Sequence, residues 1–453
     1  MKKDRPVSKG VKPKGDSVTT QQEPVEWSVE GFIDEFFKIN SQMLDRSFLF
    51  ILGSGASISS GIPGAAALAD RWLKELYDLE GGSGQPIEVW AAGILHSTDF
   101  QMENIAEFYP VIFESRFRND PERGYADLEN VMSQARPNVG YSVLAQILAK
   151  TRHKVLLTTN FDNLVEQSLF QYSDTFPLVC GHESLAGFAR PKLRRPLVAK
   201  IHRDLLLEPQ NAPAQISQLD PKWRTVLGKL LKEYCPLVIG YGGNDGSLMG
   251  FLENLLPGEI QTRLSWCYHR GSQPSKRIKD LVSKHDGRLI PILGFDEFMI
   301  QLNQKFYWPM LIEDMEAKSK SRVETYRLNF EKFSKMVEAV EGGDRQKSME
   351  PVKRAVRDTV DRDQSWFSWF LKARRETDPK KAEQIYKDGI DKNPRSAQLF
   401  GSFAVFMYEI RKEYDEAEVL YKKALELDPG DVRNMGNYAN FMYKIRKEYD
   451  EAE

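Results

Sequence analysis

The 453-residue sequence predicts an α/β domain built on a parallel β-sheet, followed by an all-α array of helical repeats. Short apolar runs alternate with helical stretches up to about residue 306, which is typical of a parallel sheet covered by helices on both faces. A glycine-rich turn joins the first apolar run, Phe48 to Leu52, to a helix that follows Pro63. In the C-terminal part, MYEIRKEYDEAE at 407–418 recurs almost unchanged as MYKIRKEYDEAE at 442–453.

The composition excludes several classes of protein. A formal net charge of −2 gives no indication of a nucleic acid or an anionic membrane as partner. The three cysteines are widely spaced, so we expect neither a disulfide scaffold nor a structural zinc site, and a reducing cytoplasm suits them. No apolar run approaches the roughly 20 residues that a membrane helix needs. Residues 1–26 lack a secretory apolar segment and are expected to form a disordered tail.

Residues 27–308 are expected to form the α/β domain. Helical spacing of apolar residues from Val25 to Leu44 predicts a helix at the sheet edge. A strand that leads into a helix through such a turn leaves backbone N–H groups free at the helix start, where an anion can bind, and the glycines allow a close approach of a ligand. The stretch at 86–150 is mostly helical and far exceeds the usual βα connection of about 2–6 residues, which predicts a helical insertion over the ligand crevice.

Five further apolar runs predict the remaining strands of a Rossmann-like sheet. They lie at 154–159, 196–201, 236–240, 263–268 and 288–293, with helices expected from Ser247 and from Phe295. Four of the predicted strands end in a glycine or a polar residue, namely Gly53, Asn160, His202 and Gly240. Ligands of parallel sheets bind beyond the carboxyl ends of the strands, so these residues are expected to meet at one ligand site.

The C-terminal part is expected to contain a helical connector at 309–363, with a break at 341–344, and repeats at 364–453. A period near 34, alanine and tyrosine at fixed places, and Pro394 and Pro429 after second helices resemble tetratricopeptide repeats. Such repeats stack on their neighbours and recognise proteins or peptides on a concave surface. Because the sequence stops within a repeat at Glu453, we expect it to be a fragment of a longer array.

A second resemblance concerns the α/β domain. The segments GSGAS and SGIP within 53–63, TTNFD at 158–162, His202 after a strand and GYGGND at 240–245 occur in this order. They resemble the motifs of the sirtuin superfamily, and most of all its zinc-free branch of NAD-consuming domains in prokaryotic antiviral defence. The resemblance covers roughly residues 48–302.

This resemblance implies a role for individual residues. Asn160 would position the attacking water beside the nicotinamide ribose, Asp162 would contact the carboxamide, and His202 would bind ribose hydroxyls, with capacity to act as a base. The residues implied to bind NAD, the pyrophosphate lying at 53–57 and the adenosine half at 240–245, are Gly53, Ser54, Gly55, Ala56, Ser57, Ile62, Pro63, Thr159, Gly240, Tyr241, Gly242, Asn244 and Asp245. No metal site is implied.

Structural roles are the alternative for the same residues. Asn160, Asp162 and Asp245 would then be caps of the helices that follow the strands. His202 would be a buried histidine without a chemical function. Ser54 and Ser57 would be ordinary turn residues.

Three departures separate the chain from the sirtuin deacylases. The paired cysteines of their zinc ribbon are absent, their acidic–aromatic–arginine triplet is replaced by Gly64-Ala65-Ala66, and their His-Gly pair is His202-Arg203. The expectation is therefore a cytoplasmic NAD glycohydrolase that acts in defence, forms a homo-oligomer and responds to a protein or peptide trigger bound by the repeats. The alternatives are an NAD-dependent protein deacylase or ADP-ribosyl transferase, and a non-catalytic module that binds NAD or ADP-ribose.

Overall fold

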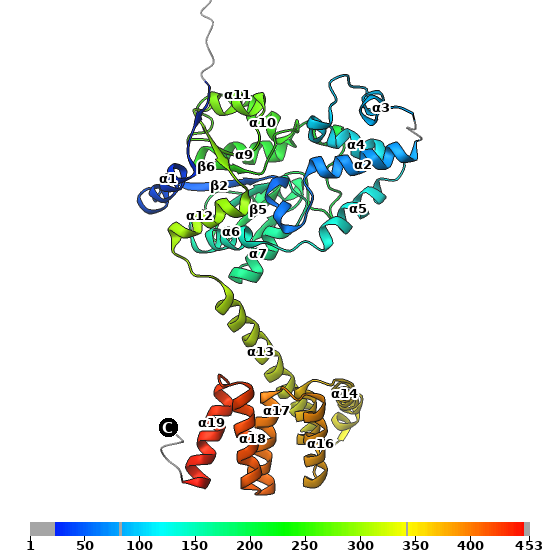
Figure 1. Cartoon of the computed structure of the whole chain (residues 1–453), viewed down its shortest axis with the longest axis vertical. Coiled ribbons are helices and arrows are strands. Elements are labelled where there is room, and N and C mark those ends of the chain that lie inside the picture. Colours follow the sequence, from blue (N-terminus) through cyan, green and yellow to red (C-terminus); the bar gives the residue numbers. More distant parts are fainter. Residues whose placement is uncertain (1–22, 81–83, 341–342, 448–453) are drawn as a thin grey trace, which may run out of the picture. The chain divides into compact units, whose positions relative to one another are not determined.

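The computed structural model describes residues 23–80, 84–340 and 343–447 (Figure 1). Its contacts divide the chain into two compact units, Met1–Leu311 and Ile312–Glu453, which are described separately below. Most of the expected tail at 1–26, part of the expected break at 341–344 and the last six residues of the second sequence repeat lie outside the described residues. None of the helices in the described ranges has the length and apolarity that a membrane crossing requires.

The first unit is a Rossmann-like α/β domain around a parallel sheet of eight strands, as the sequence predicts. The strand order is β1-β8-β7-β6-β2-β3-β5-β4. The strands are β1 (Val25–Glu26), β2 (Ser47–Leu52), β3 (Val155–Thr158), β4 (Leu178–Cys180), β5 (Leu197–Lys200), β6 (Tyr234–Ile239), β7 (Ser265–His269) and β8 (Arg288–Ile292). The chain runs outward from β2 through β3 and returns to its other side at β6, so the order reverses beside β2.

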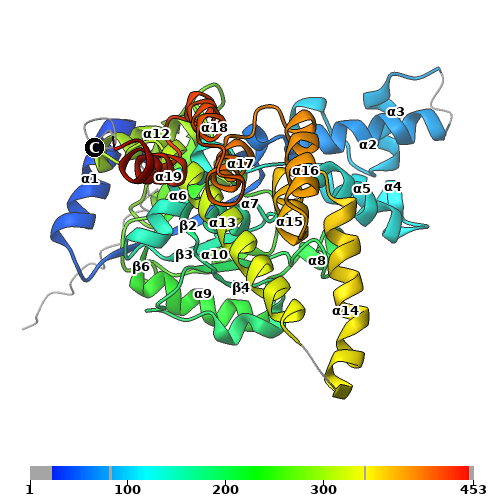
Figure 2. The same ribbon diagram turned by 90° about the horizontal axis from the view of Figure 1, so that it is seen from below.

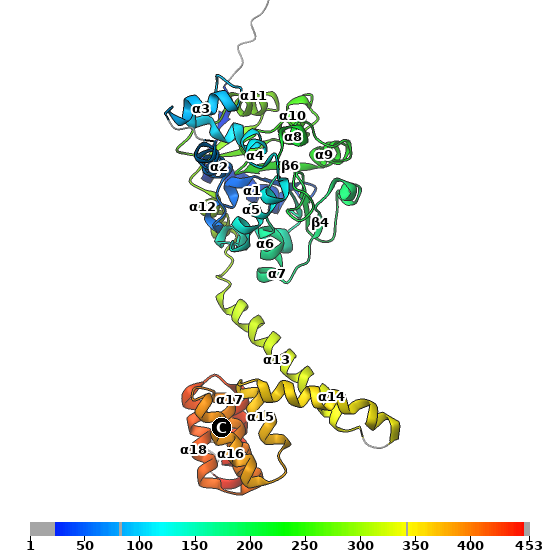
Figure 3. The same ribbon diagram turned by 90° about the vertical axis from the view of Figure 1, so that its right-hand side faces the viewer.

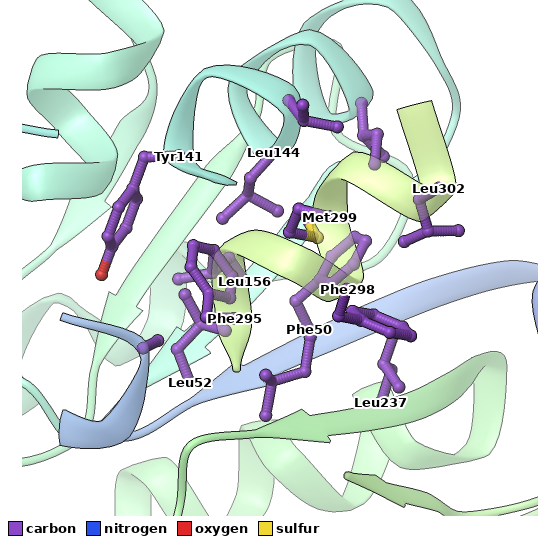
Figure 4. Close-up of a cluster of buried hydrophobic side chains, with 14 of the residues drawn as sticks. Phe50, Leu52, Tyr141, Leu144, Leu156, Leu237, Phe295, Phe298, Met299 and Leu302 are labelled. Carbon is purple, nitrogen blue, oxygen red and sulfur yellow. The ribbon is translucent and has the colours of Figure 1, made fainter. Parts of the chain in front are cut away.

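Helices cover both faces of this sheet (Figure 1). Side chains of β2 alternate between the faces, with Phe48, Phe50 and Leu52 on one side and Leu49 and Ile51 on the other. The first face carries α1 (Val29–Gln42), α6 (Val139–Lys150), α7 (Leu164–Ser173) and α12 (Phe295–Phe306). The second carries α9 (Pro221–Glu233), α10 (Leu248–Asn254) and α11 (Lys276–Lys284). Figure 4 shows the first core, where Phe295, Phe298, Met299 and Leu302 of α12 lie over Phe50 and Leu237.

A third, smaller core lies outside the two sheet layers. It joins α2 (Ala65–Leu79), α3 (Ile87–Ile94), η3 (Met102–Phe108), α4 (Tyr109–Phe117) and α5 (Pro121–Ser133). Trp72 of α2 is at its centre, with its ring against Phe113 and Phe117 and its indole N–H donating to Asp127 at 2.9 Å. The remaining short elements of this unit are η1 (Ser54–Ala56), η2 (Ile58–Ser60), η4 (Glu183–Phe188) and α8 (Pro213–Ile216).

Three details of the first unit differ from the expectations. Val25 and Glu26, expected to be helical, pair with β8, because a two-residue strand at a sheet edge has no periodicity to identify it. The three-residue strand β4 was not expected, for the same reason. Helix α6 packs on the sheet with α7 and α12, so the insertion that stands apart from the sheet ends at α5 and is shorter than the expected 86–150.

The second unit consists of helices α13 (Ile312–Glu338), α14 (Gly343–Arg362), α15 (Trp366–Arg375), α16 (Pro379–Lys392), α17 (Ala397–Phe406), α18 (Tyr414–Leu427) and α19 (Val432–Phe441). Two π-helical turns, η5 (Met407–Arg411) and η6 (Met442–Arg446), extend α17 and α19. Helices α16 and α18 begin 35 residues apart, at Pro379 and Tyr414, and so do α17 and α19, at Ala397 and Val432. Helices α15 to α19 pack in succession (Figure 2), an arrangement that stacked helical repeats require.

His153 sits at the amino-terminal side of β3, remote from the strand ends that carry the predicted site. It is fully buried, accepts a hydrogen bond at Nδ1 from the Phe48 N–H at 3.0 Å, and packs against the rings of Phe36 and Phe48. Burial, with a smaller effect from the charge of Arg152, lowers the pKa of His153 to about 3. Its imidazole is therefore neutral in the folded protein throughout the physiological range.

This burial predicts an acid-sensitive stability. The unfolded chain takes up a proton at His153 near pH 6.5, whereas the folded chain does so only near pH 3. The free energy of unfolding should therefore fall as the pH decreases from 6.5 towards 3, by roughly 4 kcal/mol from this residue. The His153→Asn variant keeps an acceptor for the Phe48 N–H but does not titrate. Denaturation curves should show a flatter pH dependence for the variant, and parallel curves for the two proteins would contradict the prediction.

Candidate active site

The carboxyl ends of the central strands converge on one cavity of about 580 Å³. The register places Leu52 of β2 beside Thr158 of β3 and Ile239 of β6, so the turns after these strands begin at the same level. Reversal of strand order beside β2 opens a crevice at this edge, as in other doubly wound sheets. Helices α2, α4 and α5, which face the viewer in Figure 3, close one side of the cavity through Leu68, Tyr109, Leu128 and Met132.

The structure brings most of the predicted site residues to this cavity. Its lining includes Asn160, Asp162, His202, Ser54, Gly55, Ser57, Ile62, Pro63, Thr159, Gly240, Tyr241, Gly242, Asn244 and Asp245. Two predicted residues, Gly53 and Ala56, are not part of the lining.

Gly53 and Gly55 join the turn after β2 to the end of β6 and the turn that follows it. Their N–H groups donate to Ile239 at 3.1 Å and to Gly240 at 2.9 Å, which continues the ladder between β2 and β6 into both turns. A Cβ on Gly53 would lie 2.5 Å from the carbonyl oxygen of Gly240. Gly240 itself has φ +68°, where a side chain is unfavourable, and a Cβ there would lie 2.4 Å from the Ala56 nitrogen. The absence of a Cβ at these positions therefore allows the two turns to pack closely, and Gly55 and Gly240 also line the cavity.

The N–H donors of this region also differ from the expectation. Ala56 and Ser57 donate within the turn, to Gly53 and Ser54, so most of the turn's N–H groups are already used. Two 3-10 turns, η1 and η2, precede α2, which begins only at Ala65 with Gly64 as its N-cap residue. The first-turn N–H groups of a helix have no partner within it. Gly64, Ala65 and Ala66 line the cavity, so the first-turn N–H groups of α2, which favour an anion, lie at its wall.

Asn160 is oriented by its amide nitrogen. Nδ2 donates to the Gly53 carbonyl at 3.1 Å and to Ser57 Oγ at 3.0 Å. The Gly53 carbonyl can only accept, so the nitrogen of the amide and not its oxygen must face it. Both amide hydrogens are then used, and Oδ1 is the group that can accept a hydrogen bond from a water or hydroxyl in the cavity. The side chain does not cap α7, so the helix-cap alternative is wrong for Asn160.

Ser57 connects Asn160 to a buried carboxylate. Its hydroxyl donates to Asp162 Oδ2 at 2.9 Å and lies 2.9 Å from the hydroxyl of Tyr141. Asp162 Oδ1 accepts from the Leu164 N–H at 3.1 Å, so Asp162 also supports the start of α7. Burial raises the pKa of Asp162, against the opposing effects of its hydrogen bonds and of Lys200. Ser57 is fully buried, and its hydroxyl contacts Asn160, Asp162 and Tyr141. An ordinary turn serine would not need these three contacts.

His202 lies in the same cavity at the end of β5. The side chain is buried, and burial lowers the pKa of its imidazole while the charge of Asp245 opposes this shift. The ring is therefore neutral near pH 7. Asp245 uses both carboxylate oxygens within the protein: Oδ1 accepts from the Leu248 and Met249 N–H groups at 2.7 and 3.3 Å, and Oδ2 accepts from the Tyr241 hydroxyl. Asp245 thus caps α10, as the structural alternative predicted, and it also lines the cavity.

Lys200 is a site residue that the sequence reasoning missed. Its side chain is fully buried, and Nζ donates to the carbonyl oxygens of Phe161 at 3.2 Å and Asp162 at 2.7 Å. The same nitrogen pairs with Asp204 at 2.6 Å and lies 3.1 Å from Glu166, whose pKa is raised by burial. Lys200 therefore fixes the loop that carries Asn160 and Asp162. The sequence does contain an indication of this role: a lysine within the apolar run PLVAKI is expected to be buried, and a buried lysine needs polar partners.

Arg203 stands where the deacylases have glycine. Its φ of +70° is in the left-handed region, where glycine is favoured. Two hydrogen bonds to Glu183, at 3.0 and 2.6 Å, hold the guanidinium. The loop after His202 therefore has a backbone conformation that favours glycine, although an arginine occupies the position.

The comparison with known protein families supports part of this description. Residues 154–285 match the family described as SIR2-like domain; the matched segment contains Asn160, Asp162, His202 and the turn at 240–245, but not the turn after β2. The comparison with curated proteins gave no match. Among solved structures, the chain is similar to the crystal structure of a Sir2 homolog–NAD complex, with 14% identity, 60% of this chain and 94% of that chain covered, and a TM-score of 0.31. It is also similar to a Sir2 homologue variant in complex with ADP ribose, with 14% identity, 61% and 99% covered, and a TM-score of 0.32.

The contact between the two turns predicts that Gly53→Ala is destabilising. The added Cβ meets backbone atoms of Gly240 and Tyr241, which cannot move aside independently. We expect a loss of about 1–3 kcal/mol in the free energy of unfolding, as for other overpacked sites. The matched control is Gly250→Ala in α10, where a Cβ meets nothing within 4 Å and which should not lose stability. Equal stabilities of the two variants in urea denaturation would contradict the prediction.

The buried cation predicts that Lys200→Met is more harmful than a surface substitution. Removal of the ammonium group leaves Glu166 and Asp204 without their partner, which should lower the free energy of unfolding by about 3–5 kcal/mol. In the double variant Lys200→Met/Glu166→Gln one uncompensated charge is removed, so part of the stability should return. Thermal denaturation measures both effects, and a single variant as stable as the wild type would show that Lys200 is dispensable.

Proposed function

We propose that the first unit is an NAD glycohydrolase, which cleaves NAD to ADP-ribose and nicotinamide. The observation that carries the proposal is Asn160, whose amide nitrogen is fixed by Gly53 and Ser57 while its oxygen is left for the cavity. A neutral His202 and the start of α2 border the same cavity. The match of residues 154–285 to the SIR2-like domain family supports an NAD-related activity.

The chemistry of the cleavage suits these groups. The bond between the ribose C1′ and the nicotinamide nitrogen breaks, the electron pair stays on the nicotinamide, and the ring leaves uncharged. A water oxygen forms the new bond to C1′ and releases one proton to the solvent. The reaction therefore needs a positioned water and polar groups at an electron-poor sugar more than it needs a strong acid. Asn160 Oδ1 would accept a hydrogen bond from that water, and positioning of this kind can lower a barrier by several kcal/mol.

Three parts of the remaining lining would hold three parts of the substrate. The first turn of α2, with Ser54, would hold the pyrophosphate, since N–H donors and the helix dipole favour an anion there. Leu68, Leu128 and Met132 provide an apolar wall for the nicotinamide ring beside Asp162. The turn at 240–245, with Gly242 and Asn244, would receive the adenosine half.

The proposal includes the organisation of the whole chain. Residues 27–308 would form the NAD-cleaving domain, 309–363 the connector and 364–453 tetratricopeptide repeats that bind a protein or peptide trigger. Cleavage of NAD on such a trigger, in a homo-oligomer in the cytoplasm, would deplete an infected cell of NAD. The helix pairs that recur 35 residues apart in α16 to α19 support the repeat assignment.

The test is incubation of the purified chain with NAD and chromatography of the products. Wild-type protein should release nicotinamide and ADP-ribose in equal amounts, and Asn160→Ala and His202→Ala should each lower the rate by about a hundredfold or more. Asn254→Ala and His96→Ala are the matched controls, because neither residue lines the cavity. Acyl-ADP-ribose or labelled protein as product would indicate a deacylase or transferase instead. Tight NAD binding in calorimetry without any product would indicate a binding module.

A further inference from the structure

Ser247 occupies a capping position without acting as a cap. It precedes α10 as the N-cap residue, where a serine hydroxyl normally accepts from the first-turn N–H groups. Ser247 makes no such bond. Asp245 Oδ1 accepts from Leu248 and Met249 in its place. The Ser247 hydroxyl, in a residue only 2% exposed, is therefore available for another contact.

That contact is with His202. Ser247 Oγ donates to Asp245 Oδ1 at 2.8 Å and lies 2.6 Å from His202 Nε2. A serine hydroxyl has one hydrogen, and an ionised carboxylate can only accept, so this hydrogen is given to Asp245. Ser247 must then accept from His202, and Nε2 must carry the imidazole hydrogen. The neutral ring consequently has its free electron pair at Nδ1.

The carboxylate at the other end of this chain is itself held in place. The hydroxyl of Tyr241 donates to Asp245 Oδ2, and both residues are buried. Arg277 contacts the same turn, where it donates to the Gly243 carbonyl at 3.0 Å and pairs with Glu253 at 2.8 Å. The charge of Asp245 acts on His202 and opposes the lowering of its pKa by burial.

We propose that Ser247 and Asp245 are positioning residues, which hold His202 as the Nε2–H tautomer and present Nδ1 to a ribose hydroxyl of the substrate. This inference rests on the proposed function, because the ribose is that of NAD. The ribose hydroxyl donates a hydrogen bond to Nδ1 while positive charge develops on the sugar. If the hydroxyl proton is transferred, Nδ1 receives it and the imidazole becomes a cation. Ser247 and Asp245 then stabilise that cation through Nε2. A neighbour that fixes the tautomer is how proteins select the reactive nitrogen of a histidine.

The first test reads the tautomer and does not depend on activity. The full chain is labelled with ¹⁵N-histidine, and the His202 signals are identified by their loss in His202→Gln. Wild-type protein and Ser247→Thr, which keeps the hydroxyl, should show the Nε2–H form. Ser247→Ala should shift the ring nitrogens towards the other tautomer. A wild-type Nδ1–H form, or a spectrum that Ser247→Ala leaves unchanged, would overturn the inference.

The second test compares kcat and KM for NAD cleavage. We expect Ser247→Ala to lower kcat by about tenfold to a hundredfold, a part of what a positioned acid or base contributes, with KM changed less than about threefold. Ser247→Thr should recover most of the loss. Ser275→Ala is the matched control, because Ser275 is the N-cap of α11 and does accept from Ile278. Its kcat should equal that of the wild type.

The two readouts separate the failure of this inference from the failure of the proposed function. If the wild type cleaves no NAD, the proposed function fails. The spectra then test only whether Ser247 and Asp245 hold His202 as the Nε2–H tautomer. If the wild type cleaves NAD and Ser247→Ala cleaves it equally fast, the positioning role is wrong while the glycohydrolase stands. A changed tautomer with an unchanged kcat counts against the role as well.

Discussion

The turns that follow β2 and β6 touch through their backbones, and the geometry of the site depends on this contact. Gly53 and Gly55 donate to Ile239 and Gly240, so the pairing of the two central strands continues beyond their ends. Asn160 is then bonded to the carbonyl of Gly53, which adds the turn after β3. Three loops from distant parts of the sequence are thus held at fixed distances by hydrogen bonds that need no ligand. Preorganisation of this kind is what a site requires when it stabilises a short-lived charge.

Two buried polar networks support the site from different strands. One joins Ser57, Tyr141 and Asp162 around Asn160, and the other joins Tyr241, Asp245 and Ser247 behind His202. Lys200 adds a third support beneath the loop at 160–162. Buried polar groups are unfavourable unless they are bonded, and a fully bonded set allows few alternative arrangements. The residues that define the cavity are therefore less free to rearrange than loop residues usually are.

The sequence predicted the sheet and the strand ends of the site but few of their contacts. Apolar runs identified six of the eight strands, and glycine or polar residues after four of them indicated where a ligand would lie. The two missed strands, β1 and β4, are too short to show a period. Ser57 and Tyr141 are 84 positions apart, and no local pattern predicts that they meet. The sequence likewise left two roles open for Asp245, because it gives the position of a residue after a strand but not its hydrogen-bond partners; the structure shows the bonds that cap α10.

The outermost strands have a consequence for assembly. β1 has two residues and β4 has three, so the described sheet offers few unpaired backbone groups at either edge. Short edges of this kind give a neighbouring chain little to hydrogen bond, which protects a sheet against growth by strand addition. Association of the first unit with another molecule through its sheet edges would gain little, so helix surfaces and loops are the better-suited points of attachment.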